Sequence, residues 1–136
     1  MDRVVRAWTV PPTGDARDRD AFAGVYTDPV TLNGTTVGLD DLVDRYRALH
    51  GAFADLAIDV VAEWSAPEGL AVAMRQRGRH VGPLPSPAGT VEPAGRAFEV
   101  LGIDLLGVTG DRVHTIWVVA DELARLAQLG AFDGRV

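Results

Sequence analysis

The sequence predicts an α+β fold in which helices come first, a strongly curved antiparallel sheet follows around an apolar concavity, and a short helix ends the chain. Apolar residues recur at helical spacing in residues 39–53, which predicts an amphipathic helix. After residue 55, several segments alternate with the two-residue period of strands, and glycine or proline separates them. Residues 121–130 then return to a helical pattern.

The segment 39–53 carries its apolar side chains on one stripe, formed by Leu39, Leu42, Val43, Tyr46, Leu49 and Phe53. Acidic residues lie toward its start and arginines later, an order that suits the helix dipole. The residues before it predict one or two short helices and then a short strand around "DPVTLNG". Residues 10–20 and 82–95 are rich in proline and glycine and predict loops, and the second is long enough to form a flap over a site.

Four segments predict the long strands of the sheet: 56–64, 70–80, 96–108 and 112–120. If the first two form a hairpin, the acids of one strand lie opposite the arginines of the other, and apolar side chains fill the other face. The third is apolar at both parities, which indicates a central strand covered on both sides. Gly130 is placed to cap the closing helix at its C-terminal end.

Length and composition exclude several classes of function. The chain has 136 residues, so we expect one domain over residues 1–136. The absence of cysteine excludes disulfides, thiolate zinc sites and thiol catalysis, and it favours a cytoplasmic location. A net charge of −6 with scattered basic residues argues against nucleic-acid binding. No apolar run is long enough to span a membrane, and the three histidines lack the spacing of a metal site.

Asp121 stands where the apolar segment 112–120 gives way to the closing helix, on the same strand parity as Trp117 and Val119. A buried carboxylate needs a partner or a proton, so this position requires an explanation. Asp121 is either the N-cap of the helix "ELARLAQL" or an acid/base group at the mouth of a pocket. The two roles are compatible, because a capping residue can still present an oxygen to a cavity.

Asp104 and His80 are further candidates for proton transfer. Asp104 has apolar neighbours in a central strand, so either an ion pair with Arg96 or Arg112 satisfies it, or it lies in a cavity with a raised pKa. His80 ends the segment 70–80 on its apolar parity, where a group that titrates near neutral pH suits acid/base catalysis. The alternative for His80 is a buried ring bonded to the backbone of the flap.

Several aromatic and polar side chains are candidates for lining a pocket that takes a flat, partly apolar ligand. They are Trp117, Trp64, Tyr26, Tyr46, Phe98, Met74 and Gln76. Aromatic residues at these spacings also suit a plain core, and that alternative stays open. Asn33 either reaches into the pocket or, with Gly34 beside it, forms a turn.

A series of short motifs runs in order along the second half of the chain. They are Arg77-Gly78-Arg79-His80-Val81-Gly82, Pro93-Ala94-Gly95-Arg96, Gly110 to Val113, Trp117 to Asp121, and Gln128-Leu129-Gly130. In this order the series resembles the SnoaL-like polyketide cyclase family, which belongs to the nuclear transport factor two-like superfamily of cone-shaped α+β barrels. The likeness covers most of the chain from about Asp28 onward.

The resemblance implies an enzyme with a cone-shaped apolar pocket and Asp121, the aspartate of the W-x-x-x-D motif, as its acid/base residue. Cyclases of this family close a ring by intramolecular aldol condensation, without metal or cofactor. We therefore expect a small apolar or polyketide-like substrate, no cofactor, and a homodimer or higher homo-oligomer. The second acid/base histidine of well-studied members is missing here, which leaves Asp104 and His80 as candidates for its role.

Three functions compete at this point. The first is the cyclase or a related acid/base catalyst, and the second is a module of the same fold that binds a small ligand without turnover. The third is an epoxide-opening hydrolase or cyclase in which the paired carboxylates of Asp104 and Asp121 activate a water or hydroxyl. The observation that separates them is whether Asp121 shares one cavity with Asp104 or His80.

Overall fold

The structure, a computed structural model, describes residues 1–132. Its elements are, in chain order, α1 (Asp2–Thr9), α2 (Ala16–Ala23), β1 (Tyr26–Leu32), β2 (Thr35–Val37), α3 (Leu39–Ala52), β3 (Phe53–Ala66), β4 (Gly69–His80), β5 (Ala97–Thr109), β6 (Arg112–Ala120) and α4 (Glu122–Gln128). This order of elements confirms the predicted α+β class, including the long central helix, the four long strands and the short C-terminal helix.

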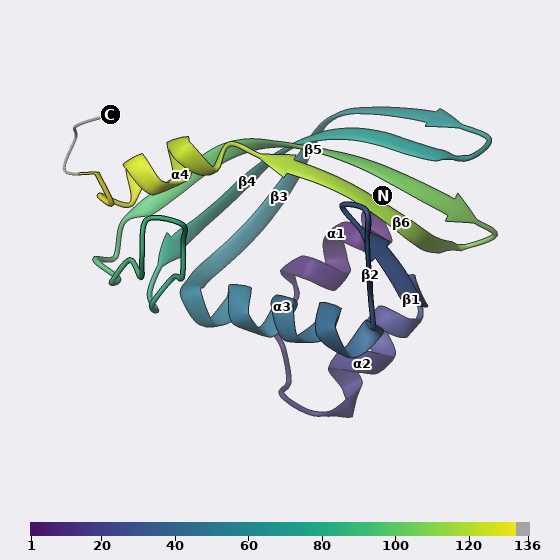
Figure 1. Ribbon diagram of the computed structural model, residues 1–136, viewed down its shortest axis with the longest axis horizontal. Helices are drawn as coiled ribbons and strands as arrows, with labels where there is room; N and C mark the ends of the chain where they lie inside the picture. The colour runs from purple at the N-terminus through teal and green to yellow at the C-terminus, as the bar shows by residue number, and fades with distance from the viewer. Residues whose placement is uncertain (133–136) are drawn as a thin grey trace.

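The six strands form one curved sheet in the order β2-β1-β6-β5-β4-β3. The pairs β3–β4, β4–β5 and β5–β6 are antiparallel, whereas β1 runs parallel to β6, so the sheet is mixed. Figure 1 shows the sheet arching over α1, α2 and α3, with α4 at the far end beside the loop that joins β4 to β5. The helices therefore cover the concave inner face of the sheet, and its convex outer face stays open.

The core lies between the inner face of the sheet and the N-terminal helices. Phe22 of α2 packs between Trp8 of α1 and Tyr46 of α3, with ring centroids 5.2 and 4.9 Å away. The predicted apolar stripe of α3 is buried at Leu39, Leu42, Val43 and Tyr46. Burial of this stripe holds α3 against the sheet, since short helices depend on packing for most of their stability.

The hairpin of β3 and β4 has the predicted pairing of acids and arginines. Arg77 forms an ion pair with Asp59 at 2.9 Å, and Arg79 lies 3.5 Å from Asp55. A β-bulge interrupts the register of β3 between Val60 and Ala62. A first shift lies between Ala54 and Ala57. Because a shift of one residue moves every later side chain to the other face, Trp64 at the end of β3 no longer lies on the face of Ile58 and Val60.

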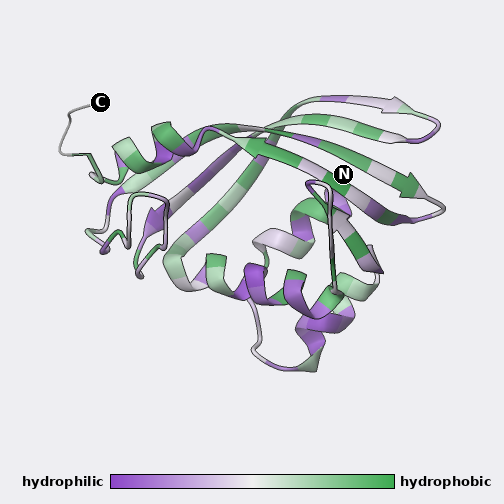
Figure 2. Cartoon of the chain, viewed as in Figure 1, coloured by the Kyte–Doolittle hydropathy of each residue, from purple (hydrophilic) through white to green (hydrophobic). Residues whose placement is uncertain are grey.

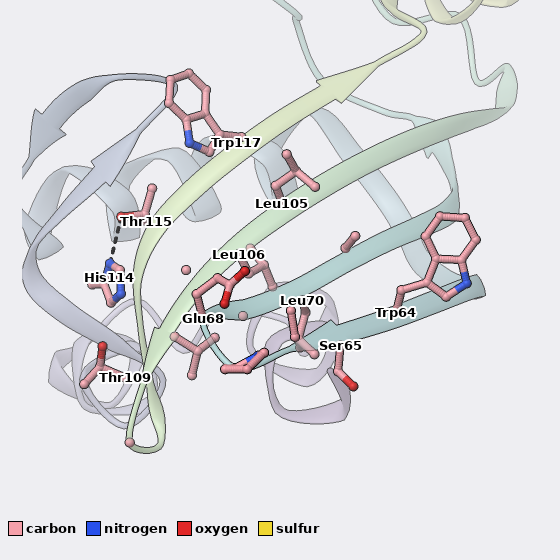
Figure 3. Close-up of a pocket in the computed structure, with 17 residues that line it drawn as sticks. Trp64, Ser65, Glu68, Leu70, Leu105, Leu106, Thr109, His114, Thr115 and Trp117 are labelled. Carbon is pink, nitrogen blue, oxygen red and sulfur yellow. Dashed lines mark hydrogen bonds between the residues drawn. The ribbon is translucent and has the colours of Figure 1, made fainter.

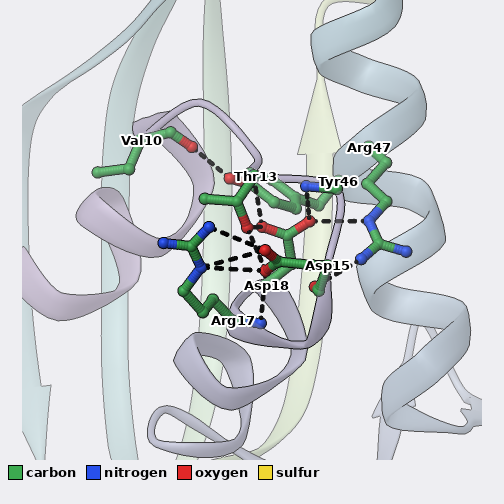
Figure 4. A network of polar contacts seen from close by, with 8 residues as sticks. Val10, Thr13, Asp15, Arg17, Asp18, Tyr46 and Arg47 are labelled. Carbon is green, nitrogen blue, oxygen red and sulfur yellow. Dashed lines mark hydrogen bonds and ion pairs between the residues drawn. The ribbon is translucent and has the colours of Figure 1, made fainter.

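Polar contacts fix the segment between α1 and α2, as Figure 4 shows. The Asp18 carboxylate accepts a hydrogen bond of 2.8 Å from the backbone N–H of Thr13 and pairs with Arg47 of α3 at 2.9 Å. Burial raises the pKa of Asp18, but these hydrogen bonds outweigh it and lower the pKa to about 2. The Tyr46 hydroxyl donates to the Val10 carbonyl. The predicted loop at residues 10–20 is thus shorter than expected and tied to α3.

The connection between β4 and β5 is the predicted long loop. A single bridge between Leu84 and Val91 and a tight turn at residues 86–89 give it local order. It returns to the sheet where Arg96 accepts a hydrogen bond of 2.8 Å from the backbone N–H of His80. After α4, Gly130 has a φ of 81°, the left-handed conformation expected of the glycine that ends a helix.

Candidate functional site

An apolar cavity of about 380 Å³ lies between the inner face of the sheet and helices α1, α3 and α4. This volume is within the range of small-molecule sites. Its apolar lining includes Val4, Trp8, Leu42, Leu56, Ile58, Met74, Phe98, Ile116 and Val118. Its polar lining consists of Tyr26, Arg45, Gln76, Asp104, Glu122 and Arg125. A largely apolar hollow with a few converging polar groups is the usual form of a ligand site.

Asp104 is the acid that the sheet contributes to this cavity. It lies on the inner face of β5, opposite Val72 of β4 and Val118 of β6. One carboxylate oxygen, Oδ1, is buried and has no hydrogen-bond partner. Burial raises the pKa of Asp104 from its ordinary value of 3.8 to about 6. The side chain is therefore a carboxylate at neutral pH and takes up a proton more readily than an exposed aspartate does.

Tyr26 of β1 reaches the same cavity and is held by Trp8. The indole Nε1–H of Trp8 donates to the Tyr26 hydroxyl oxygen at 2.7 Å. Burial raises the pKa of Tyr26 against the effect of this hydrogen bond, and the negative charge of Asp104 adds to the rise. Tyr26 therefore remains a phenol, which can donate its own proton to a ligand.

A second polar group lies at the α4 end of the cavity. The Arg125 guanidinium donates to Gln76 Oε1 at 2.7 Å and to Glu122 Oε1 at 2.8 Å, and it stacks over the Phe98 ring at 4.8 Å. Arg125 is only 8% exposed, and its Nε has no hydrogen-bond partner. Gln76, Glu122 and Arg125 are called the α4 polar group below.

Five of the side chains expected at the site do line this cavity: Tyr26, Asp104, Met74, Gln76 and Phe98. The ion pair considered for Asp104 is not formed. Arg112 instead donates to the Ala23 carbonyl at 3.0 Å, and the eight ion pairs of residues 1–132 include none with Asp104. Of the two alternatives for Asp104, the structure therefore has the cavity with a raised pKa rather than the ion pair.

The expectation that Asp121 looks into the pocket does not hold. Its carboxylate accepts a hydrogen bond of 3.0 Å from the backbone N–H of Ala124, which makes it the N-cap of α4. Asp121 is exposed and does not line the cavity. It has the parity of Trp117 and Val119, as predicted, but that parity faces outward, because Ile116 and Val118 hold the inward positions of β6.

His80 also lies outside the cavity lining. Its side chain is 0% exposed and packs against the Phe53 ring at 5.6 Å. Neither ring nitrogen has a hydrogen-bond partner. The contact with the flap runs through the backbone of His80, which bonds Gly95 and Arg96, rather than through the ring. The structure therefore places His80 in the core beside Phe53, outside the cavity that Asp104 lines.

Both tryptophans expected in the pocket lie on the outer side of the sheet. Trp64 is 77% exposed and Trp117 is 50% exposed. The bulge in β3 turns Trp64 outward, and for Trp117 the alternation was uninformative because both parities of β6 are apolar. They flank an open hollow of about 760 Å³ at the ends of the two hairpins, as Figure 3 shows. This hollow is larger than the inner cavity, but the residues that line it include no buried acid.

Tyr46 and Asn33 complete the expected pocket side chains, and neither lines the cavity. Tyr46 belongs to the core between α1, α2 and α3. Asn33 has a φ of 48° and forms the turn after β1, where its amide oxygen accepts a hydrogen bond of 2.8 Å from the backbone N–H of Val118. The turn alternative is therefore the correct one for Asn33.

The sheet also carries exposed apolar side chains on its convex side. We call Trp64, Leu101, Ile103, Leu105, Trp117 and Val119 the outer apolar face. The register places Leu105 beside Trp117 and Ile103 beside Val119, so the face is continuous across β5 and β6. Figure 2 shows the long hydrophobic runs of these strands. Contiguous exposed apolar areas are typical of contact sites.

Two further observations bear on the class of site. Within residues 1–132, no group of three or more histidine, aspartate or glutamate side chains is arranged to hold a metal ion. Among the same residues, none of the helices has the length and apolar character needed to cross a membrane.

A family model described as SnoaL-like polyketide cyclase matches residues 2–129. The chain belongs to the SnoaL-like polyketide cyclase family. The match extends over nearly the whole sequence, further toward the N-terminus than the motifs alone indicated, and it supports a cyclase-type role. No curated protein sequence matches the chain.

Solved structures show that this SnoaL-like protein has the fold of its family. TsrD from Streptomyces laurentii aligns with a TM-score of 0.80 at 20% identity, over 96% of this chain and 92% of that one. A SnoaL-like candidate polyketide cyclase from Jannaschia sp. CCS1 aligns with a TM-score of 0.75 at 19% identity, over 96% and 90%. IdmH from Streptomyces antibioticus, also described as a candidate polyketide cyclase, gives 0.75 at 19% identity, over 95% and 96%.

Within this family member, sequence reasoning missed Arg125 and Glu122 as cavity residues. A signal was available, because Arg125, Leu126 and Leu129 share one helical stripe and the two leucines are buried. A charged residue on a buried stripe requires partners, and these partners are Glu122 and Gln76. Trp8 was also missed, since its role depends on a contact with Tyr26 that no local pattern indicates.

Proposed function

We propose that this protein is an acid/base enzyme that closes a ring by intramolecular aldol condensation, with Asp104 as its proton carrier. The observation that carries the proposal is a single aspartate with an unpartnered buried oxygen and a raised pKa in an apolar cavity. Family membership adds the cyclase-type role. The substrate we propose is a small, mostly apolar, polyketide-like molecule with at least two carbonyl groups.

The reaction needs one proton carrier and conserves all atoms in its addition step. Asp104 takes the proton from a carbon next to a carbonyl, and the electron pair of that C–H bond becomes an enolate. The enolate carbon attacks a second carbonyl of the same molecule, so that a C–C bond forms and the attacked oxygen becomes an alkoxide. Protonated Asp104 then returns its proton to this oxygen. The proposal requires neither metal nor cofactor, since the carboxylate supplies the base and its conjugate acid.

The cavity suits this chemistry for two physical reasons. Its apolar walls restrict a flexible chain and bring the two reacting carbons together, an effect that lowers the barrier through proximity. The same walls disfavour charge on Asp104, so its basicity is greater than that of an aspartate in water. Tyr26, a phenol fixed by Trp8, adds a hydrogen-bond donor in the same space.

The first test measures proton abstraction directly. Acetophenone and 1-phenylbutane-1,3-dione are incubated in D₂O with the protein, and exchange at the α-carbon is followed by NMR above the buffer rate. We expect Asp104→Asn to reduce the protein-catalysed exchange by about 10²–10⁴-fold, the usual contribution of a general base. We expect the wild-type rate to rise with pH and to level off above about 6, because Asp104 must be ionised.

Val72→Ala is a suitable control, since it changes a neighbour of Asp104 without removing the acid. Equal exchange by wild type and Asp104→Asn, or no exchange above buffer by the wild-type protein with either ketone, would contradict the proposal. Saturable binding of the ketones without exchange would favour the ligand-binding module instead.

Epoxide opening by paired carboxylates receives no support from Asp104 and Asp121. Asp104 lies on the inner face of β5, whereas Asp121 is an exposed helix cap. The backbone N–H of Asp121 bonds the carbonyl of Leu101, three residues from Asp104 along β5. At about 3.3 Å per residue the two positions are roughly 10 Å apart, on opposite faces. They are therefore not placed to activate one water molecule.

We also propose that a second copy of the chain covers the outer apolar face. This face lies beside a band of opposite charges in which Arg75, Arg77 and Arg79 of β4 adjoin Asp59 and Glu99. Because a two-fold interface brings the same patch together from both copies, such a mixed band can pair with itself. Burial of the apolar side chains would then drive association, and the charges would set its direction.

A further inference from the structure

The α4 polar group shares the cavity with Asp104 but has no role in the steps above. We propose that the Gln76 amide is a further catalytic group, which donates a hydrogen bond to the enolate oxygen formed when Asp104 removes the proton. We further propose that Arg125 is the positioning residue that holds this amide in the donating orientation. The inference rests on the proposed function and specifies how the substrate lies in the cavity.

The orientation of the Gln76 amide follows from its contact with Arg125. Arg125 Nη2 lies 2.7 Å from Gln76 Oε1. A guanidinium only donates hydrogen bonds, so the amide oxygen must be the atom that faces it. The two N–H groups of Gln76 therefore point away from Arg125 and are available to a ligand.

Arg125 is itself held firmly, which makes it suitable as a support. It pairs with Glu122 at 2.8 Å and stacks over Phe98 at 4.8 Å. It is only 8% exposed, so solvent screens these contacts little. Glu122 also balances the charge of Arg125, so the group presents the neutral donors of Gln76 rather than a free cation. Such a neutral donor therefore suits a ligand whose neutral carbonyl becomes an enolate better than it suits a ligand with a carboxylate.

Gly102 shows where the N–H groups lie. A Cβ atom at Gly102 would stand 3.1 Å from Gln76 Nε2, so the missing side chain makes room for the amide on the inner face of β5. Gly102 precedes Asp104 by two residues and lies on the same face of the strand. At about 3.3 Å per residue, the amide nitrogen and the acid are therefore roughly 7 Å apart along β5.

This separation fits one ketone with its neighbouring carbon. A base in contact with a C–H group and a donor bonded to the carbonyl oxygen each span about 3 Å. The reacting carbon and its carbonyl group fill the rest of the distance between the Gln76 amide and Asp104. The geometry points to a substrate whose reacting ketone has its oxygen toward α4 and its acidic carbon toward Asp104, with the rest of the molecule along the apolar wall.

The physical effect is stabilisation of charge as it develops. The donor is in place before the reaction and lies in an apolar environment, so it favours the enolate over the neutral ketone. Loss of one such donor reduces turnover by about 100-fold. Simple ketones, whose enolates are less stable, depend on this donor more than diketones do. A structural role for Gln76 would not produce that difference.

The experiment compares variants in the D₂O exchange assay, with acetophenone and 1-phenylbutane-1,3-dione as probes, at a pH where each rate has levelled off. Gln76→Met removes the amide, and Gln76→Glu keeps an acceptor for Arg125 while it removes both N–H donors. Arg125→Met frees the amide to rotate. Val72→Ala is again the control, because it changes a buried residue of the same strand that does not line the cavity.

We expect both Gln76 variants to slow acetophenone exchange by about 100-fold and to slow the diketone clearly less. Arg125→Met should fall between wild type and Gln76→Met, and Val72→Ala should match wild type. If Asp104→Asn is inactive but both Gln76 variants keep wild-type rates, the role of Gln76 is overturned and the proposed function stands. Equal losses with the two ketones would also overturn it, whereas an active Asp104→Asn would remove the proposed function itself.

Discussion

The two faces of the sheet are both rich in apolar residues, yet they differ in what interrupts them. The inner face contains Asp104, an acid whose buried Oδ1 has no hydrogen-bond partner. The outer face contains no acid among its exposed apolar rows, and its charges are confined to one end, where Asp59 pairs with Arg77. The unpartnered acid is the basis for the chemistry that we propose on the inner face, and the uncovered apolar surface is the basis for the contact that we propose on the outer face.

The difference teaches how to assign faces when both are apolar. Alternation along a strand separates two sets of side chains, but it does not say which set is inside. In β6, Ile116 and Val118 line the cavity while Trp117 and Val119 face outward. The inside is identified by the elements that cover it, and here these are α1, α3 and α4.

The largest effect that we predict concerns the outer face and the association of two copies through it. Val119→Asp places one carboxylate from each copy in the proposed interface, where an unpaired buried charge costs several kcal/mol. We expect the dimer dissociation constant to rise by about 100-fold or more. Sedimentation analysis over a range of concentrations measures it.

Val81→Asp provides the control, since Val81 is an exposed apolar residue of the loop after β4 and not of the outer apolar face. A wild-type protein that remains monomeric at high concentration, or a Val119→Asp variant that associates like wild type, would show that a second copy does not cover this face.

The next effect concerns the inner face, where Asp104 makes the free energy of unfolding depend on pH. Burial raises the pKa of Asp104 from 3.8 to about 6, so the ionised group destabilises the folded state above that pH, whereas below 3.8 it is neutral in both folded and unfolded chains. One pKa unit corresponds to about 1.4 kcal/mol, so the full effect is of the order of 3 kcal/mol. Arg45, Glu122, Arg125 and Tyr26 face the same cavity.

We therefore expect Asp104→Asn to be more stable than wild type by up to about 3 kcal/mol at pH 8 and to lose this advantage as the pH falls to about 4. Urea unfolding at several pH values tests the prediction, with the difference between the two proteins as the measured quantity. The Asp18 carboxylate, whose pKa is lowered, is present in both proteins and cancels from the difference. An advantage that does not change with pH would contradict the burial of an ionised Asp104.

The fold was predictable from the sequence to a large extent, because its elements have strong local signals. The stripe of α3, the alternation of β4 and the apolar run of β5 appear at the expected residues. The parallel pairing of β1 with β6 was not predictable, since it depends on contacts between distant segments. The bulge in β3 was also hidden, because no glycine or proline marks the residues between Val60 and Ala62.

The site was predictable only in part, for a physical reason. Met74 and Gln76 lie on β4, whose parity is read correctly, so they reach the cavity as expected. The expectation that β5 is covered on both sides was wrong, because Leu101, Ile103 and Leu105 are exposed, and Asp104 and Phe98 lie on its covered inner face. His80 has the same parity as Gln76 but lies at the end of the strand, beyond the cavity and behind the ring of Phe53. Parity gives the face of a residue, whereas the extent of a cavity depends on which helices close it.

The smallest predicted effect concerns the residue that the family resemblance favoured. Asp121 accepts a hydrogen bond from the Ala124 N–H as the cap of α4, and asparagine caps a helix about as well as aspartate does. We expect Asp121→Asn to change the free energy of unfolding by a few tenths of a kcal/mol at most, and Asp121→Ala to lower it by about 1 kcal/mol. Both variants should exchange the ketone probes at the wild-type rate. Chemical denaturation and the D₂O assay measure the two quantities separately. Loss of exchange in a fully folded Asp121→Asn would return the proton carrier to the outer end of β6, and the inner and outer faces could then no longer be divided between chemistry and contact.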